Sequence, residues 1–130
     1  MNKKVLIVDD DDDVRTFLLT VLEENNYTPL IAHDGIEGKD MIEKHKPDLV
    51  ILDVLMPRGS GIQLFRKLKT DDSLKKIPVI MFTGISLKSF LRSQKVLDEF
   101  QNGKVPKPDI YLEKPVEPEE LIEAIQKKIG

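Results

Sequence analysis

Three acidic residues, one threonine and one lysine stand directly after short apolar runs of the chain, where polar groups from separate segments can act together. Asp9 and Asp10 follow the first run, Asp53 follows the third, Thr83 ends the fourth, and Lys114 follows the fifth. Carboxylate oxygens with room for water are the ligands that Mg²⁺ prefers. An ammonium group beside them could pair with phosphate oxygens. The set could therefore perform phosphoryl transfer, which needs mainly positioning and charge neutralisation.

The segments that carry these residues alternate between two kinds of apolar pattern. Short, continuous, β-branched runs are typical of strands covered on both faces, and apolar residues at helical spacing indicate amphipathic helices. Five strands alternating with five helices predict an α/β fold, a doubly wound parallel sheet with right-handed crossovers. We expect strands over 5–8, 30–32, 48–52, 79–82 and 110–112, and helices over about 13–25, 36–46, 61–70, 87–101 and 118–129.

In an open α/β sheet, ligands bind outside the carboxyl ends of the strands, near the point where the strand order reverses. Four of the five strand ends would therefore bring their polar residues to one place. Three carboxylates in one crevice repel one another, and one lysine with one divalent cation would neutralise them. The sequence thus predicts a magnesium site that can receive an anionic phosphoryl group.

Each of these residues also has an ordinary structural explanation. Asp11, Asp12 and Asp13 fit a solvated acidic block, with Asp13 a candidate helix N-cap. Thr83 and Ser86 are both candidates for a helix cap. Lys114, considered by itself, would be an ordinary surface lysine. Their joint placement at strand ends is what favours a site.

Composition excludes several classes of function. The chain has 130 residues, a net charge of −3 and no cysteine. A DNA-binding module is usually basic, and thiol or zinc–thiolate chemistry needs cysteine. No apolar run approaches the roughly 20 residues of a membrane span. We expect one domain over residues 1–130 with no output domain, in the cytoplasm, contacting neither nucleic acid nor membrane.

Four segments carry a resemblance to a known family. They are Val5–Asp10, Pro47–Pro57 with Gly61, Pro78–Gly84, and Tyr111–Pro115. In this order the chain resembles the receiver domain of bacterial two-component response regulators, of the stand-alone kind found in chemotaxis. The resemblance implies a flavodoxin-like (βα)5 fold with strand order 2-1-3-4-5.

The resemblance also implies roles for single residues. Asp53 would be the phosphoacceptor and Lys114 and Thr83 would bind the phosphoryl oxygens. Mg²⁺ would be held by Asp10, Asp53 and the backbone carbonyl of Leu55, with Asp9 holding metal-bound water. Thr83 and Tyr111 would form the switch, and the backbone N–H groups of Val54, Leu55 and Gly84 would face the phosphate. Lys114-Pro115 is expected to be a cis peptide.

The resemblance further implies partners. A sensor histidine kinase, a histidine phosphotransfer protein or a small donor such as acetyl phosphate would supply the phosphoryl group. The fourth helix, fifth strand and fifth helix would contact a protein target, and the chain would be a monomer or a phosphorylation-linked dimer. The segment from Thr83 to Lys114 is longer than usual for the family, by roughly two helical turns, which lengthens the fourth helix or its exit loop.

Three other functions are compatible with parts of this pattern. A Mg²⁺-dependent phosphohydrolase with an aspartyl intermediate usually has a second acid two residues past the nucleophile, where this chain has Leu55. A degenerate receiver used as a scaffold would lack part of the site set, which is complete here: Asp9, Asp10, Asp53, Thr83 and Lys114. Flavin binding would need a phosphate-cradling loop where Asp9 and Asp10 stand. We therefore expect a signalling module that catalyses only its own phosphorylation and slow dephosphorylation, and is not otherwise an enzyme.

Overall fold

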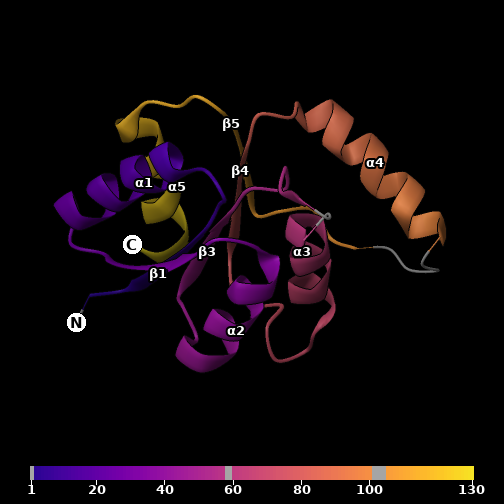
Figure 1. Cartoon of the computed structure of the whole chain (residues 1–130), viewed down its shortest axis with the longest axis horizontal. Coiled ribbons are helices and arrows are strands. Elements are labelled where there is room, and N and C mark those ends of the chain that lie inside the picture. The colour runs from indigo at the N-terminus through magenta and orange to yellow at the C-terminus, as the bar shows by residue number, and fades with distance from the viewer. Residues whose placement is uncertain (1, 58–59, 101–104) are drawn as a thin grey trace.

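The computed structural model describes residues 2–57, 60–100 and 105–130, which form five strands and five helices in strict alternation (Figure 1). The strands form one parallel sheet in the order β2-β1-β3-β4-β5. The predicted doubly wound α/β fold is therefore confirmed. The elements are β1 Lys4–Val8, α1 Asp12–Glu24, β2 Thr28–Ala32, α2 Gly35–His45, β3 Leu49–Leu52, α3 Ser60–Thr70, β4 Val79–Thr83, α4 Leu87–Phe100, β5 Ile110–Glu113 and α5 Pro118–Ile129.

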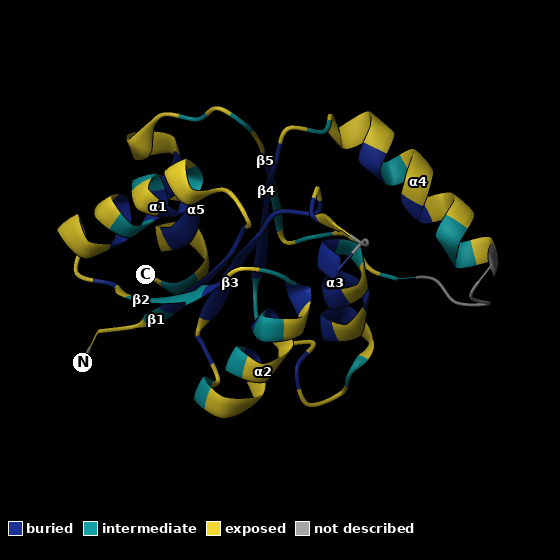
Figure 2. Cartoon of the chain, viewed as in Figure 1, coloured by how far each residue is buried: buried dark blue, intermediate teal, exposed yellow. Residues whose placement is uncertain are grey.

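Two apolar cores lie on opposite faces of the sheet, because successive strand residues point to opposite sides. In β1, Leu6 and Val8 belong to the core under α2, α3 and α4, whereas Val5 and Ile7 belong to the core under α1 and α5. Figure 2 shows the strands buried in the middle and the outer helix faces exposed. The continuous apolar runs in the sequence thus mark strands that are covered on both faces.

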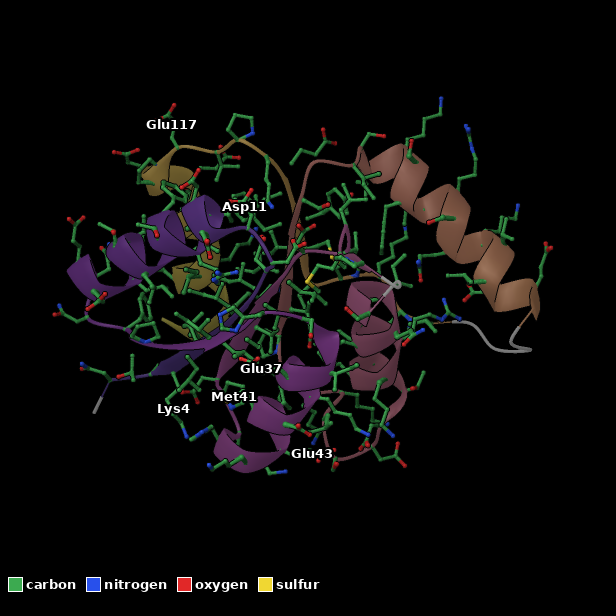
Figure 3. All side chains as sticks on the ribbon, viewed as in Figure 1. Lys4, Asp11, Glu37, Met41, Glu43 and Glu117 are labelled. Carbon is green, nitrogen blue, oxygen red and sulfur yellow. The ribbon has the colours of Figure 1, made fainter. Side chains whose placement is uncertain are left out.

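Side-chain caps fix where several helices begin. Asp11 caps α1, accepting hydrogen bonds from the backbone N–H groups of Asp13 and Val14, so Asp13 is not the cap. Asp34 caps α2 through the Glu37 N–H, at 2.8 Å. Figure 3 shows Asp11 and Glu117 at the starts of α1 and α5, where acidic groups suit the helix dipole.

Ser86 accepts a hydrogen bond from the Ser89 N–H at 3.2 Å and caps α4, so Ser86 rather than Thr83 is the cap. At 14 residues, α4 is the longest of the described helices. The end predicted for this helix, at about residue 101, lies outside the described residues. None of the helices in the described part of the chain is both long and apolar enough to cross a membrane.

Candidate functional site

The parallel register brings the predicted site residues to one edge of the sheet. Val8 pairs with Leu52 in neighbouring strands, so Asp9 and Asp53, the next residues along, lie side by side. Thr83 pairs with Glu113, which places Lys114 beside the end of β4. The Lys114-Pro115 peptide bond is cis, as expected. Residues as far apart as Asp9 and Lys114 thus meet because four strands end together.

Lys114 joins the two buried carboxylates of the site. Its Nζ lies 2.9 Å from Asp9 Oδ2 and 3.2 Å from Asp53 Oδ2. The other oxygen of each carboxylate accepts a backbone N–H two residues on, from Asp11 at 2.9 Å and from Leu55 at 2.9 Å. Each aspartate is therefore held between its own loop and the lysine, with a fixed orientation.

Asp10 completes a cluster of three acids. One carboxylate oxygen from each of Asp9, Asp10 and Asp53 lies within 4.8 Å of the others. Asp9 and Asp53 are buried, at 2% and 5% exposure, whereas Asp10 is exposed. Three carboxylates with one lysine leave two uncompensated negative charges. The donor set and the charge both suit a hard divalent cation such as Mg²⁺.

The pKa values of Asp9 and Lys114 reflect the crowding of charged groups at the site. Burial raises the pKa of Asp9 above its ordinary value, against the hydrogen bonds from the Asp11 N–H and from Lys114. Burial works to lower the pKa of Lys114, but the hydrogen bond to Asp9 and the charges of Asp53 and Asp9 outweigh it and raise that pKa. Lys114 therefore stays an ammonium, and Asp9 sits where added positive charge is favourable.

Thr83 ends β4 with its side chain fully buried, and none of the described residues hydrogen-bonds to its Oγ1. A buried hydroxyl is normally paired, so an unpaired one beside a site is a candidate for a ligand or a second conformation. Tyr111, on β5, donates its hydroxyl to the Ile85 carbonyl at 2.7 Å. Burial, with the charges of Glu113 and Asp53, raises the pKa of Tyr111 to about 12, so it remains a donor.

The loops after β3 and β4 hold the remaining predicted residues. Val54 is buried, whereas Leu55 is 55% exposed and Gly84 is exposed. The Leu55 N–H, predicted to face phosphate, here donates to Asp53 itself. A Cβ added to Gly84 would meet nothing within 4 Å, so this loop has free space around it.

Two contacts at the site were not foreseen from the sequence. Arg15 is buried on α1, donates from Nη1 to the Asp9 carbonyl at 2.8 Å, and pairs with Asp12. Lys114 Nζ lies 5.4 Å from the centre of the Phe82 ring, over which it packs. Arg15 lies between Val14 and Leu18 on the inner side of α1. This position is the only feature of the sequence that indicates the burial of Arg15.

Fold and site together define a doubly wound domain with an acid–lysine centre at the carboxyl ends of its strands. Residues 5–126 match the response regulator receiver domain family. The chain is 32% identical over 126 residues to the phosphate regulon transcriptional regulatory protein PhoB of Escherichia coli, covering 97% of this chain and 51% of that protein. It thus spans about half the length of that relative.

Two further relatives are covered almost completely. The chain is 30% identical to the polar-differentiation response regulator DivK of Brucella anthropi over 132 residues, covering 100% of this chain and 98% of that protein. The signal receiver domain of a signal transduction histidine kinase from Syntrophus aciditrophicus superimposes with a TM-score of 0.82 at 30% identity, over 98% and 89% of the two chains. The chain belongs to the receiver domains of two-component response regulators, and phosphoryl acceptance follows from that family.

Proposed function

We propose that Asp53 is the residue of this chain that accepts the phosphoryl group. The observation that supports this choice most strongly is the contact of Lys114 with both Asp53 and Asp9 at the edge where four strands end. Among the three clustered acids, Asp53 alone directly follows the central strand β3, and it lies between the lysine and the exposed Leu55 loop. A donor that reaches Asp53 therefore meets a carboxylate that already has the Lys114 ammonium beside it.

The proposed step is a direct transfer to a carboxylate oxygen. An Asp53 oxygen forms the new bond to phosphorus while the bond from phosphorus to the donor breaks, and the donor leaves with that electron pair. With phosphohistidine the leaving group is a neutral imidazole after it takes up a proton from solvent. With acetyl phosphate the leaving group is acetate. The product is an acyl phosphate on Asp53.

The acidic cluster fits Mg²⁺ because two of its negative charges are uncompensated and its donors are carboxylate oxygens. Asp10, Asp53 and the Leu55 carbonyl would hold the ion, with Asp9 holding its water. The bound ion supplies charge neutralisation for the transferring phosphoryl group. Lys114 is placed to release one Asp53 oxygen and pair with a phosphoryl oxygen instead, since its Nζ already lies at that carboxylate.

Thr83 and backbone N–H groups would bind the other phosphoryl oxygens. The unpaired Oγ1 of Thr83 is a donor without a present partner among the described residues. The N–H groups of Val54, Leu55 and Gly84 are the further candidates, with Leu55 exchanging its Asp53 contact for the phosphate. When Thr83 moves toward the phosphate, Tyr111 can leave the Ile85 carbonyl and turn into the vacated space.

This movement would change the surface formed by α4, β5 and α5 and so alter binding of a protein target. The donor would be a sensor histidine kinase or a histidine phosphotransfer protein, because receiver domains as a family work with these partners. On this proposal residues 1–130 form a single receiver domain, a monomer or a phosphorylation-linked dimer, that catalyses only its own phosphorylation and slow dephosphorylation.

Intact-mass measurement after incubation with acetyl phosphate and Mg²⁺ tests the proposal against two of its alternatives, a phosphohydrolase and a scaffold. We expect one phosphoryl adduct on the wild-type chain, lost without Mg²⁺ and absent from Asp53→Asn. Rapid release of phosphate over many turnovers would instead indicate a phosphohydrolase. A wild-type chain that never gains an adduct would indicate a scaffold, and either result would overturn the proposal.

A further inference from the structure

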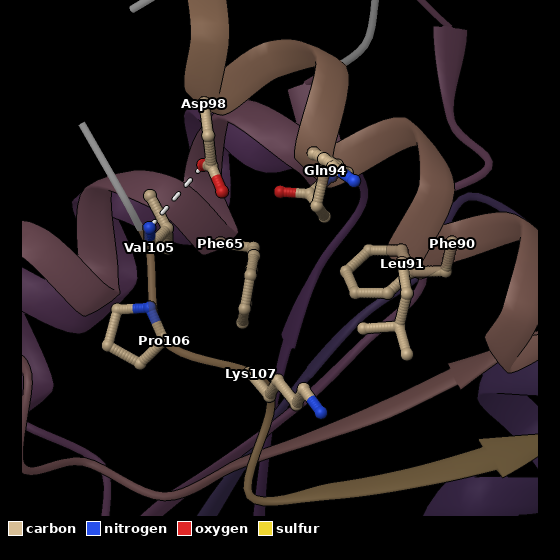
Figure 4. A pocket seen from close by; sticks show the side chains of 9 residues that line it. Phe65, Phe90, Leu91, Gln94, Asp98, Val105, Pro106 and Lys107 are labelled. Atoms are coloured by element: carbon tan, nitrogen blue, oxygen red, sulfur yellow. Dashed lines mark hydrogen bonds between the residues drawn. The ribbon is translucent and has the colours of Figure 1, made fainter. Parts of the chain in front are cut away.

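A second cavity, of about 570 Å³, lies between α3, α4 and residues 105–107, and none of its lining residues belongs to the acidic site (Figure 4). Phe65, Phe90, Leu91, Val105 and Pro106 supply its apolar walls. Ligand sites of proteins are mostly apolar clefts of roughly 300–1,000 Å³ with a few placed polar groups. The cavity has the size and lining of such a site.

Polar contacts hold the cavity open. Arg66, on α3, donates to Gln94 Oε1 and to Asp98 Oδ1 on α4, each at 2.8 Å. Asp98 also accepts the Val105 N–H at 3.4 Å, a contact drawn in Figure 4. The rings of Phe65 and Phe90 meet edge to face, with centroids 5.8 Å apart. These contacts join α3, α4 and the segment before β5 around the space, so the apolar walls need not collapse onto one another.

The polar groups left over at the cavity are donors and cations. Gln94 is buried, and its Oε1 accepts a hydrogen bond from Arg66. Its Nε2 has no hydrogen-bond partner among the described residues. The charge of Asp98 is compensated by Arg66. Lys95 and Lys107 also line the cavity, and neither ammonium forms an ion pair or hydrogen bond within the described part of the chain. The cavity therefore offers apolar surface, excess positive charge and an unused donor.

We propose that this cavity binds a small amphipathic carboxylate. The apolar or aromatic body of the ligand packs against Phe65, Phe90 and Leu91, and its carboxylate pairs with Lys95 and Lys107. Gln94 supplies a further donor. A neutral hydrocarbon would leave the cationic rim without a partner, and a cationic ligand would be repelled by it. The proposal does not rest on Asp53 being the phosphoacceptor, because no residue of the acidic site lines the cavity.

A titration followed by ¹H–¹⁵N NMR tests the proposal with two probes of the same shape, 4-phenylbutyrate and the neutral 4-phenylbutyramide. We expect saturable shifts of the Gln94 side-chain amide and of the backbone amides of Leu91, Lys95 and Lys107. The carboxylate should bind about fivefold more tightly than the amide, the scale of two exposed ion pairs. Equal binding of the two probes would overturn the assigned ligand class, and the absence of saturable shifts at these residues would overturn the site.

Charge-reversal pairs on the exposed surface provide the matched control. Lys95→Glu with Lys107→Glu should weaken carboxylate binding about fivefold or more and leave amide binding unchanged. Lys88→Glu with Arg92→Glu makes the same change in net charge on the exposed face of α4, outside the cavity lining, and should have little effect. An equal loss in both double variants would show a general charge effect and contradict the proposal.

Discussion

Replacing Thr83 by valine should separate the stability of the resting protein from the response to phosphate. Thr83 is fully buried and its Oγ1 has no partner among the described residues. A buried hydroxyl without a hydrogen bond costs about 1–3 kcal/mol. Valine has nearly the same shape and no hydroxyl. Thr83→Val should therefore raise the free energy of unfolding by about 1 kcal/mol and Tm by roughly 3–5 °C.

The assay is urea denaturation without Mg²⁺ or phosphodonor, with the slope m compared between variants so that the denatured state is controlled. Thr83→Ser is the matched control, because it keeps the hydroxyl and loses a buried methyl group, at a cost of about 1 kcal/mol. A loss of stability of more than about 1 kcal/mol in Thr83→Val, at unchanged m, would refute the reasoning, since it would show that the hydroxyl is already paired.

The same variant should respond less to a phosphoryl group. On the proposed function, Thr83 Oγ1 gains its partner only when a phosphoryl oxygen arrives. Mg²⁺ with beryllofluoride, a phosphoryl analogue, should raise Tm in the wild type through binding to the folded state. In Thr83→Val that added stabilisation should fall by about 1 kcal/mol, the value of one hydrogen bond. An undiminished response would remove Thr83 from the phosphate site.

Two further predictions concern acid stability and the lifetime of the phosphoryl group. Burial works to raise the pKa of Asp109, but its hydrogen bonds to Lys69 and to the Val79 N–H outweigh it and hold that pKa below its ordinary value. The ion pair thus contributes stability above the unfolded pKa of about 3.9 and loses it as the pH falls through the lower folded pKa. Because the Asp109 carboxylate is partly exposed, Asp109→Asn should cost about 1 kcal/mol at pH 7, and progressively less below pH 4, in urea unfolding. A cost undiminished at pH 2 would contradict this prediction. Leu55 and Ile85 are apolar residues in the loops that follow Asp53 and Thr83. On the proposed function, replacing both by glutamine should speed loss of the phosphoryl group at least roughly tenfold, because polar groups can then position the attacking water. An unchanged decay of the phosphorylated mass would disprove this prediction.

The strands and the convergence of the site could be predicted because both follow from local pattern and topology. Residues 5–8 and 49–52 are continuous apolar runs, as strands covered on both faces must be. Parallel pairing then requires their carboxyl ends to share one edge. The contact between Asp9 and Lys114, 105 residues apart, needed no further information than this.

Features that depend on tertiary packing could not be predicted in the same way. In the run from Asp9 to Asp13 every residue has the same side chain, so the choice of Asp11 as the cap depends on where the chain leaves the sheet. Arg15 reads as a surface residue of a helix, yet the Asp9 carbonyl draws its guanidinium inward.

The second cavity depends in the same way on pairings between distant elements. Arg66 on α3 meets Gln94 and Asp98 on α4, and 28 residues separate Arg66 from Gln94 in the chain. No local pattern distinguishes these side chains from exposed helix residues. The space they frame became visible only in the folded chain.

The location of the phosphoryl group tests the central proposal most directly. Borohydride reduces an aspartyl phosphate to homoserine, which tandem mass spectrometry locates in the chain. After treatment with acetyl phosphate and Mg²⁺, we expect homoserine at position 53 alone, and none when Mg²⁺ is withheld. Homoserine at position 9 or 10, or a phosphorylated chain with no reducible aspartyl phosphate, would contradict the assignment of Asp53 as the acceptor.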